Sequence, residues 1–115
     1  ADPAAIHTAR DALRARIAVH LGELLGELHL AMQDAGAFSA DAEAAGRRAL
    51  RNAALDMLAA DGRAATLARA EGHYRAAANM TDRIAGLNAL MLFGGEPFEA
   101  GLAEFYARFD HEPLV

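Results

Sequence analysis

Apolar residues recur along the N-terminal part of the chain at steps of three, four and seven, the spacing of one face of an α-helix. Asp2 suits the cap of such a helix, and Pro3 suits its first position, where the amide would be unpaired in any case. Gly22 and Gly26 interrupt the stripe, and each costs about 1 kcal/mol relative to alanine inside a helix. We therefore expect a helix that is bent or broken near these glycines. The stripe comprises Ile6, Leu13, Ile17, Leu21, Leu24, Leu28 and Met32.

A loop and two further helices are predicted in the middle of the chain. The stretch 34–41 is typical of a loop, and Ser39 is the candidate cap for the helix that follows. That helix is expected to run to Asp61 and to stop at Gly62, since glycine permits the left-handed turn that ends helices. A short helix over 63–72 comes next and depends on packing for its stability. The predicted buried face of the longer helix consists of Leu50, Ala53, Ala54, Met57 and Leu58.

The tetrapeptide Asn79-Met80-Thr81-Asp82 predicts the start of another helix. Asn79 is a good N-cap with Thr81 as the alternative, and Asp82 stands where a capping box needs a carboxylate. This helix should end at Gly94-Gly95, and Glu96-Pro97 then opens the last helix. The two predicted buried faces are Ile84, Leu87 and Met91 on the first helix, and Phe98, Leu102, Phe105 and Phe109 on the second.

The fold class that follows is all-α, with five to six antiparallel helices. Alanine supplies 31 residues, whereas valine, isoleucine and threonine together supply eight, so strands are disfavoured. Short connections fit either an armadillo/HEAT-like superhelical hairpin array or a closed helical bundle. The chain end has no polar cap, as expected for an array cut mid-way. We expect residues 1–115 to form a single helical domain of a longer polypeptide, which self-associates when isolated because its end exposes apolar surface.

Composition narrows the function further. The chain has no cysteine and no apolar run approaching eighteen residues, and its N-terminus does not look like a signal peptide. We therefore expect a cytoplasmic protein with no membrane association. A net charge of −5 disfavours nucleic-acid binding, which needs a concentrated basic face. Every positive side chain except histidine is arginine, a bias typical of a GC-rich bacterial gene.

No catalytic or metal-binding residue is predicted in this chain. Its five histidines do not form the H-E-x-x-H pattern of a catalytic zinc site. His20 and Glu23 lie one turn apart, but a surface pair explains them better than a shared metal. Ser39 is the only serine and lacks the G-x-S-x-G turn of a nucleophile.

Four anchors in register resemble the C-terminal helical domain of bacterial aminopeptidase N, a family of zinc exopeptidases. They are Asp2-Pro3, Leu50-Arg51-Asn52-Ala53 within RRALRNAALDMLA, Asn79 to Asp82 after Tyr74 and Ala77, and Phe105-Tyr106 with Leu114-Val115. The similarity covers nearly all of the chain and corresponds to the first portion of that domain. Two departures, a shorter segment over 34–46 and Phe109 where tryptophan is common, affect local geometry only.

The resemblance implies a parent enzyme of several domains that removes N-terminal residues from peptides. In the family, zinc is held by an H-E-x-x-H motif and a further glutamate in the catalytic domain, and those motifs are not in this sequence. The resemblance implies that this part is non-catalytic, that it partners the catalytic domain of the same polypeptide, and that it narrows access to the cavity for peptide substrate. A free-standing helical-repeat scaffold that binds another protein is the alternative.

The resemblance also marks the tetrapeptide Asn79, Met80, Thr81 and Asp82 as a family signature. We expect it to cap a helix and to hold a tight corner between two helices. Asn79, Met80 and Arg83 are in addition candidates to line the peptide cavity, since the positive end of a helix dipole attracts a carboxylate.

Overall fold

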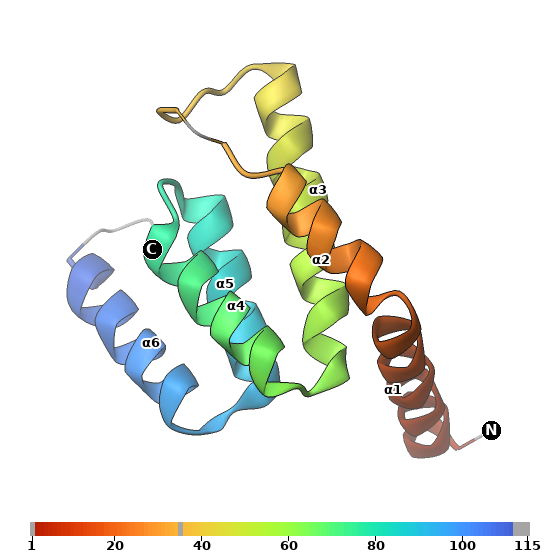
Figure 1. Cartoon of the computed structure of the whole chain (residues 1–115). Helices are drawn as coiled ribbons and strands as arrows, with labels where there is room; N and C mark the ends of the chain where they lie inside the picture. The colour runs from red at the N-terminus through yellow and green to blue at the C-terminus, as the bar shows by residue number, and fades with distance from the viewer. Residues whose placement is uncertain (1, 35, 112–115) are drawn as a thin grey trace.

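The computed structural model describes residues 2–34 and 36–111, and within them the chain is all-helical, as predicted. Figure 1 shows α2 beside α3 and α4 beside α5, with α1 projecting at one end and α6 standing at the other. The Leu114-Val115 end, one anchor of the resemblance, lies outside the described residues. The elements are α1 Pro3–His20, α2 Gly22–Ala31, α3 Ala42–Leu58, the 3-10 turn η1 Ala59–Asp61, α4 Ala64–Ala76, α5 Met80–Phe93 and α6 Gly95–Phe109.

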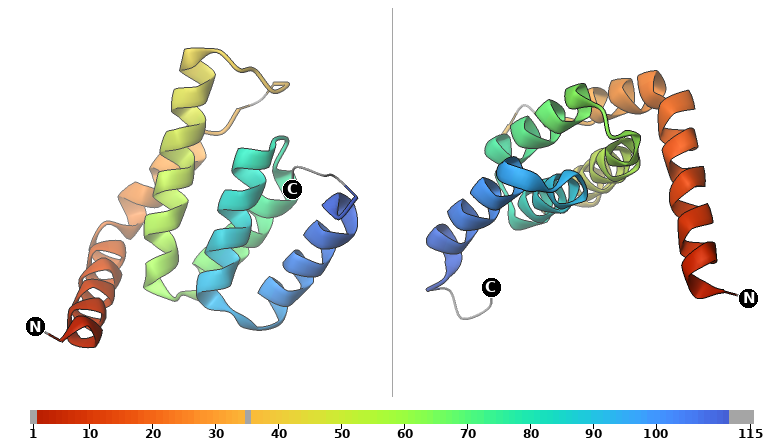
Figure 2. Two further views of the ribbon diagram at one scale, coloured as in Figure 1. Left: turned by 180° about the vertical axis from the view of Figure 1, so that it is seen from behind. Right: turned by 90° about the horizontal axis from the view of Figure 1, so that it is seen from below.

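The expected break in the first helix occurs at Leu21. Its φ of −102° and ψ of 9° leave the helical region, although its amide still donates to the Ile17 carbonyl at 2.9 Å. The chain therefore changes direction between α1 and α2 without losing the hydrogen bond at the break. Figure 2 shows the outcome, with α1 running at a steep angle to α2 and away from the other helices.

Helix α3 begins at a different cap from the predicted one. The Asp41 side chain accepts a hydrogen bond from the Ala44 amide at 2.8 Å, whereas Ser39 donates its hydroxyl to the Asp41 carboxylate. The prediction of a Ser39 cap is wrong because Ser39 lies two residues too early to reach the first turn. The far end is as predicted, since η1 closes at Gly62 with a φ of +67°.

The core lies between α3, η1, α4 and α5 and combines alanines with a few large side chains. Its main cluster contains Leu55, Ala59, Ala70, Tyr74, Ala89 and Leu90. The predicted face of α3 is partly wrong, because Leu50, Ala53 and Met57 are exposed while Ala54, Leu55 and Leu58 are buried. On α5 Ile84 and Met91 are exposed and Leu87 is partly buried, whereas Gly86, Ala89 and Leu90 are buried.

Close approach of helices α4 and α5 explains the difference on α5. A Cβ atom at Gly86 would lie 2.9 Å from the Cα of Tyr74 and 3.0 Å from its backbone nitrogen. The two backbones pack this closely only because position 86 carries no side chain. The predicted face of α5 is therefore wrong for Ile84 and Met91, which are exposed, whereas Leu87 packs against the core as predicted.

Helix α6 packs on one side only, so its predicted buried face is partly exposed. Phe98, Phe105 and Phe109 are half-buried and Leu102 is 40% exposed. Gly101 is the one fully buried residue described in α6. The Tyr74 hydroxyl donates to the Glu104 carboxylate and so ties α6 to α4. Burial, followed by this hydrogen bond, raises the pKa of Tyr74 to about 12.

The Gly86 contact gives a direct test of the packing. We expect Gly86→Ala to lower the free energy of unfolding by about 1–3 kcal/mol, because its methyl group would meet backbone atoms that cannot move aside. Gly46→Ala is the matched control, since nothing lies within 4 Å of its Cβ and alanine is the better helix former by about 0.5–1 kcal/mol. Urea unfolding followed by circular dichroism measures both. Equal stability of the two variants would contradict the close approach.

Candidate functional site

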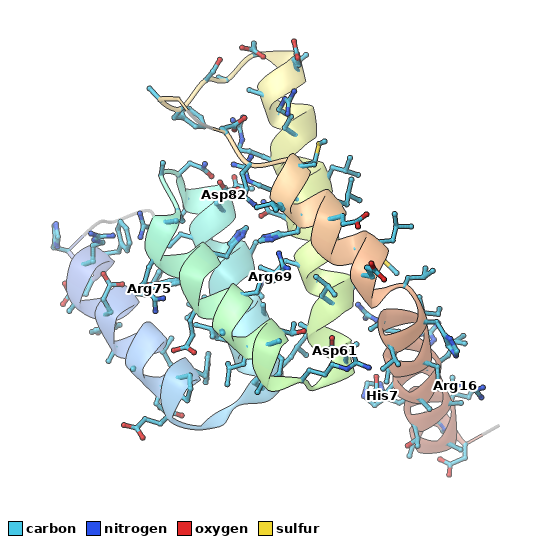
Figure 3. All side chains as sticks on the ribbon, viewed as in Figure 1. His7, Arg16, Asp61, Arg69, Arg75 and Asp82 are labelled. Carbon is cyan, nitrogen blue, oxygen red and sulfur yellow. The ribbon has the colours of Figure 1, made fainter. Side chains whose placement is uncertain are left out.

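Buried polar side chains gather where α2, α3, α4 and α5 meet, at the start of α5. Figure 3 shows Asp82 at the start of α5, with Arg69 below it between α4 and α2. Such a concentration of charge inside a small helical protein is unusual, because buried ionisable groups need partners to offset their lost hydration. This buried polar network comprises His29, Arg51, Asn52, Arg69, His73, Asn79 and Asp82.

Asn79 caps α5 in the structure. Its backbone is extended, and its side-chain oxygen accepts a hydrogen bond from the Asp82 amide at 2.8 Å. In a capping box the Asp82 carboxylate would accept a hydrogen bond from the Asn79 backbone amide. It accepts hydrogen bonds from the side chains of Asn79, Asn52 and Arg51 instead. The first turn of α5 is thereby attached to α3.

Arg51 is the centre of this attachment. Its guanidinium donates to the Asp82 carboxylate, and its other terminal nitrogen donates at 3.0 Å to both the Met32 carbonyl and the Asp34 carboxylate. Only 4% of Arg51 and 5% of Asp82 is exposed, so this is a buried ion pair. One side chain on α3 therefore holds the end of α2, the following loop and the start of α5.

The pKa values of this pair reflect the balance between burial and hydrogen bonding. Burial by itself raises the pKa of Asp82, but hydrogen bonds from Arg51, Asn52 and Asn79 outweigh it and hold that pKa below its usual range. Burial lowers the pKa of Arg51, and its hydrogen bonds to Asp82 and Asp34 more than restore it. Both groups are charged at neutral pH.

Two histidines connect α2 with α4. Nε2 of His29 lies 2.9 Å from Nδ1 of His73, and Nη1 of Arg69 lies 3.0 Å from Nδ1 of His29. Because arginine only donates, Nδ1 of His29 must accept, and its proton must sit on Nε2. That Nε2–H then donates to Nδ1 of His73, which places the His73 proton on its own Nε2. Two tautomers follow from the one arginine.

Both histidines are neutral at neutral pH. Burial, followed by the charges of His73, Arg69 and Arg51, lowers the pKa of His29 to about 4, while Asp82 opposes this change. Burial likewise lowers the pKa of His73. A proton added here would place a third cation beside Arg51 and Arg69.

The network is not fully satisfied by the described residues. Nε2 of His73 and Oδ1 of Asn52 are buried polar atoms without a hydrogen-bond partner among them. The charge of Asp82 partly offsets the effect of burial on the pKa of His73. Buried polar atoms are normally paired, so rigidity here comes at some cost in stability.

The predicted site residues do not gather on one surface. Asn79 and Asp82 line a cavity of about 70 Å³ together with the loop after α2 and the arginines of α3. Met80 is half-buried and Thr81 exposed, and neither lines that cavity. Arg83 donates to the Ala77 carbonyl at 2.7 Å and lies over the Tyr74 and Phe109 rings, so it closes the α4–α5 corner.

Sequence reasoning missed five members of the network: His29, Arg51, Asn52, Arg69 and His73. A signal existed for two of them. Arg51 falls in register with the buried positions 54, 55 and 58, and His29 falls in register with 25, 28 and 32. A polar residue in a buried register indicates a partner on another helix.

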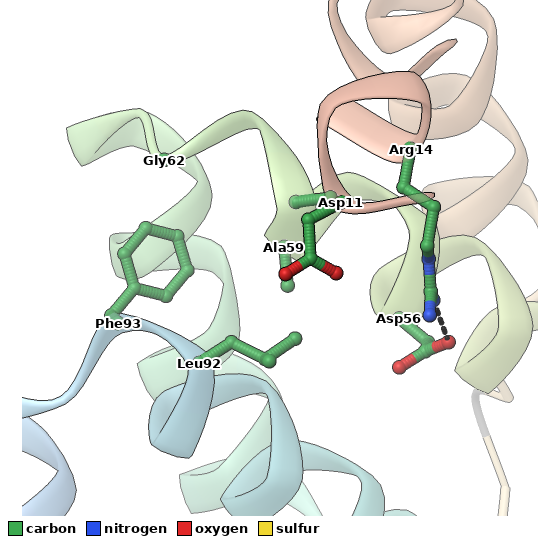
Figure 4. A pocket seen from close by; sticks show the side chains of 8 residues that line it. Asp11, Arg14, Asp56, Ala59, Gly62, Leu92 and Phe93 are labelled. Carbon is green, nitrogen blue, oxygen red and sulfur yellow. Dashed lines mark hydrogen bonds and ion pairs between the residues drawn. The ribbon is translucent and has the colours of Figure 1, made fainter. Parts of the chain in front are cut away.

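A larger cleft lies outside the network. Figure 4 shows this hollow of about 330 Å³, lined by Asp11 and Arg14 of α1, Asp56 of α3 and Leu92 and Phe93 of α5. The Arg14–Asp56 ion pair at 3.0 Å crosses it, but both side chains are more than half exposed. Such pairs contribute about 0–1 kcal/mol, so this cleft is weakly held.

Among residues 2–34 and 36–111, no group of three or more His, Cys, Asp or Glu side chains is arranged to hold a metal ion. No helix in the described part of the chain is long and apolar enough to cross a membrane.

The α2–α3 and α4–α5 pairs lie side by side and are joined by the buried polar network, an arrangement typical of a helical-repeat domain. The chain belongs to the family described as "Domain of unknown function (DUF3458_C) ARM repeats", which matches residues 1–115. The hairpin array is thereby favoured over the closed bundle. The chain is also 58% identical, over all 115 residues, to part of Aminopeptidase N from Caulobacter vibrioides, and it spans 13% of that relative's length. The resemblance to a helical portion of aminopeptidase N is confirmed.

The Arg51–Asp82 pair is open to a double-mutant test. We expect Arg51→Ala to cost about 3–5 kcal/mol, because it leaves a buried carboxylate without its cation. Replacing both partners with apolar side chains, as in Arg51→Met with Asp82→Leu, should cost less than Arg51→Ala alone. Arg14→Ala, at the exposed pair, should cost about 0–1 kcal/mol. A double variant that costs as much as Arg51→Ala or more, measured by urea unfolding, would contradict this expectation.

The histidine pair predicts an acid-sensitive interval. Burial lowers the folded-state pKa of His29 from 6.5 to about 4. The stability of the fold with a neutral His29 is therefore complete above pH 6.5 and is lost as pH falls toward 4. The loss is at most about 1.4 kcal/mol per pH unit for each histidine. The stabilising contribution of the Asp82 carboxylate is lost at lower pH, below the usual range of an aspartate pKa.

Thermal unfolding at a series of pH values checks this interval. His29→Gln should flatten the decline between pH 6.5 and 4, whereas His7→Gln, at an exposed position on α1, should leave it unchanged. A wild-type melting temperature that stays constant across the interval would be incompatible with two buried neutral histidines.

Proposed function

We propose that the chain is a non-catalytic part of the C-terminal helical domain of a zinc-dependent aminopeptidase that removes N-terminal residues from peptides. In this proposal its helices shape the substrate chamber and restrict entry to it. The observation that carries the proposal is the 58% identity to part of Aminopeptidase N across the whole chain. The match to an ARM-repeat family over residues 1–115 supports the structural role.

The zinc ion that such an enzyme implies does not fit the described residues of this chain. They offer no set of three or more His, Cys, Asp or Glu side chains suited to a metal, and His29 and His73 are already hydrogen-bonded to each other. We therefore assign the zinc and the hydrolytic residues to a catalytic domain elsewhere in the same polypeptide. In this proposal the present chain forms part of the lining of the substrate chamber.

The buried polar network supports a rigid arrangement of the helices in this proposal. Arg51 and the two histidines connect the α2–α3 hairpin to the α4–α5 hairpin through buried contacts. In repeat proteins each unit touches only its neighbours, so the stiffness of such interfaces sets the shape of the whole array. A rigid interface keeps a chamber of constant width.

We assign the tetrapeptide Asn79 to Asp82 to the corner between α4 and α5. Asn79 and Asp82 hold each other and α3, and Arg83 holds the preceding carbonyl. Contact of Asn79, Met80 or Arg83 with a peptide stays a prediction, as does a cytoplasmic location.

Assays of the full-length polypeptide and of residues 1–115 on an aminoacyl-anilide test the proposal. We expect turnover only with the full-length polypeptide, and loss of that turnover after treatment with a zinc chelator. Chelator-sensitive hydrolysis by residues 1–115 alone would overturn the non-catalytic role. A polypeptide without an H-E-x-x-H motif or without aminopeptidase activity would favour the free-standing scaffold.

Restriction of entry has its own measurement in the full-length enzyme. Arg51→Ala removes contacts that join the helical hairpins and alters no catalytic group. It should therefore raise kcat/KM for long peptides relative to a dipeptide. An unchanged ratio in a folded variant would show that these helices do not control access.

A further inference from the structure

A polar cavity of about 290 Å³ lies between the start of α2, the end of η1 and the first half of α4. Glu23 of α2, Asp61 of η1 and Arg69 of α4 are among the residues that line it. Figure 3 shows Arg69 between α4 and α2, with Asp61 below it near the end of α3. The volume is close to the lower end of the range of about 300–1,000 Å³ that is typical of small-molecule sites. The cavity therefore has room for a small polar ligand.

The guanidinium of Arg69 has no counter-ion among residues 2–34 and 36–111, although its side chain is half-buried. Its Nη1 donates to Nδ1 of His29 at 3.0 Å and to the Gly26 carbonyl at 3.4 Å, and both acceptors are neutral. A guanidinium carries five N–H donors, and a carboxylate can accept two of them in parallel. Arg69 therefore retains donors for an anion.

Glycines of α2 form the wall of the cavity beside these donors. Gly22 and Gly26 both line it, and their spacing of four residues puts them on one face of the helix. A Cβ atom at Gly26 would lie 3.1 Å from Nη2 of Arg69, so Nη2 rests against this face. No described atom lies within 4 Å of a Cβ atom at Gly22, so no contact among the described residues requires glycine there. Glycine is a poor helix former, but it lets a ligand approach the backbone closely.

The charges around the cavity indicate the class of ligand. Arg63 and Arg69 contribute two cations, and Glu23 and Asp61 contribute two carboxylates. The Asp61 carboxylate is already engaged, since it accepts hydrogen bonds at 2.8 Å from the Arg63 amide and from the Thr66 hydroxyl. Glu23 is exposed and forms no ion pair with a described residue. Two carboxylates repel a dianion such as phosphate, whereas a ligand with one anionic and one cationic group suits both Arg69 and Glu23.

We propose that this cavity binds a free amino acid, with the α-carboxylate on the Arg69 guanidinium and the α-ammonium group toward Glu23. The binding site goes beyond the role of the helices in a peptidase and needs no hydrolysis. A ligand in this position contacts both α2 and α4, the two helices that the His29–His73 hydrogen bond connects. A bound amino acid should therefore slow the opening of these two helices.

Hydrogen exchange of the full-length polypeptide tests the site, with L-alanine as the probe and the amides of α2 and α4 as the readout. Openings that expel the ligand become rarer by a factor of one plus the ratio of its concentration to its dissociation constant. We expect exchange of the two helices to slow about threefold when L-alanine is at twice its dissociation constant. N-acetyl-L-alanine lacks the ammonium group and ethylamine lacks the carboxylate, so neither compound should slow it.

Two variants locate the binding. Gly22→Leu places a side chain in the cavity, and Glu23→Gln removes the carboxylate that faces the ammonium group. Neither residue belongs to the buried polar network, so the hydrogen bonds of Arg69 stay in place. Glu27→Gln is the matched control, because Glu27 is exposed on the same helix and does not line the cavity. We expect the first two variants to weaken L-alanine binding at least about tenfold and the control to leave it unchanged.

Unchanged exchange of α2 and α4 in the presence of L-alanine would overturn the proposal. Equal slowing by either analogue would also overturn it, because a single charge would then suffice for binding. Slowing that persists in both Gly22→Leu and Glu23→Gln would place the amino acid elsewhere in the polypeptide and refute this site. The measurement does not depend on peptidase activity, so failure of the proposed function leaves it unaffected.

Discussion

The buried pair between Arg51 and Asp82 is the interaction on which the arrangement of the helices depends. It joins residues 31 apart in the chain, and the same arginine also holds the end of α2 and the loop beyond it. Removing a buried charge from water is costly, so the pair is stable only when every partner is in place. We interpret this all-or-none requirement as the feature that sets the register of the two hairpins.

Buried polar contacts suit a core in which helices approach each other closely, as α4 and α5 do at Gly86. Alanine and glycine faces allow close approach, as at Gly86 against Tyr74, but they offer few large side chains whose shapes would specify one register over another. The polar contacts supply that specificity. The His29–His73 hydrogen bond, oriented by Arg69, adds a second fixed point between α2 and α4.

The described surface of this chain carries many large apolar side chains. Large apolar side chains are exposed on α1, α2, α5 and α6, whereas the buried apolar residues described are five alanines, four leucines and one tyrosine. Large side chains contribute most to the hydrophobic effect when they are buried. Their exposure on these helices leaves apolar surface open to contacts outside the described residues.

The sequence by itself determined the helical class and most helix boundaries. The Asn79 cap, the stop at Gly62 and the break at Leu21 depend on hydrogen bonds and backbone angles within a few residues, so local patterns predict them. Even the wrong cap at Ser39 was displaced by two positions only.

Only the tertiary structure decided which helix faces are buried and which polar groups meet. The partners of His29 and Arg51 lie 44 and 31 residues away, and no local pattern carries that information. The same holds for α1, where Ala18 is buried while Ile6 and Leu13 of the predicted apolar stripe are exposed. Helix formation is a local choice, whereas the choice of face is made by all the helices together.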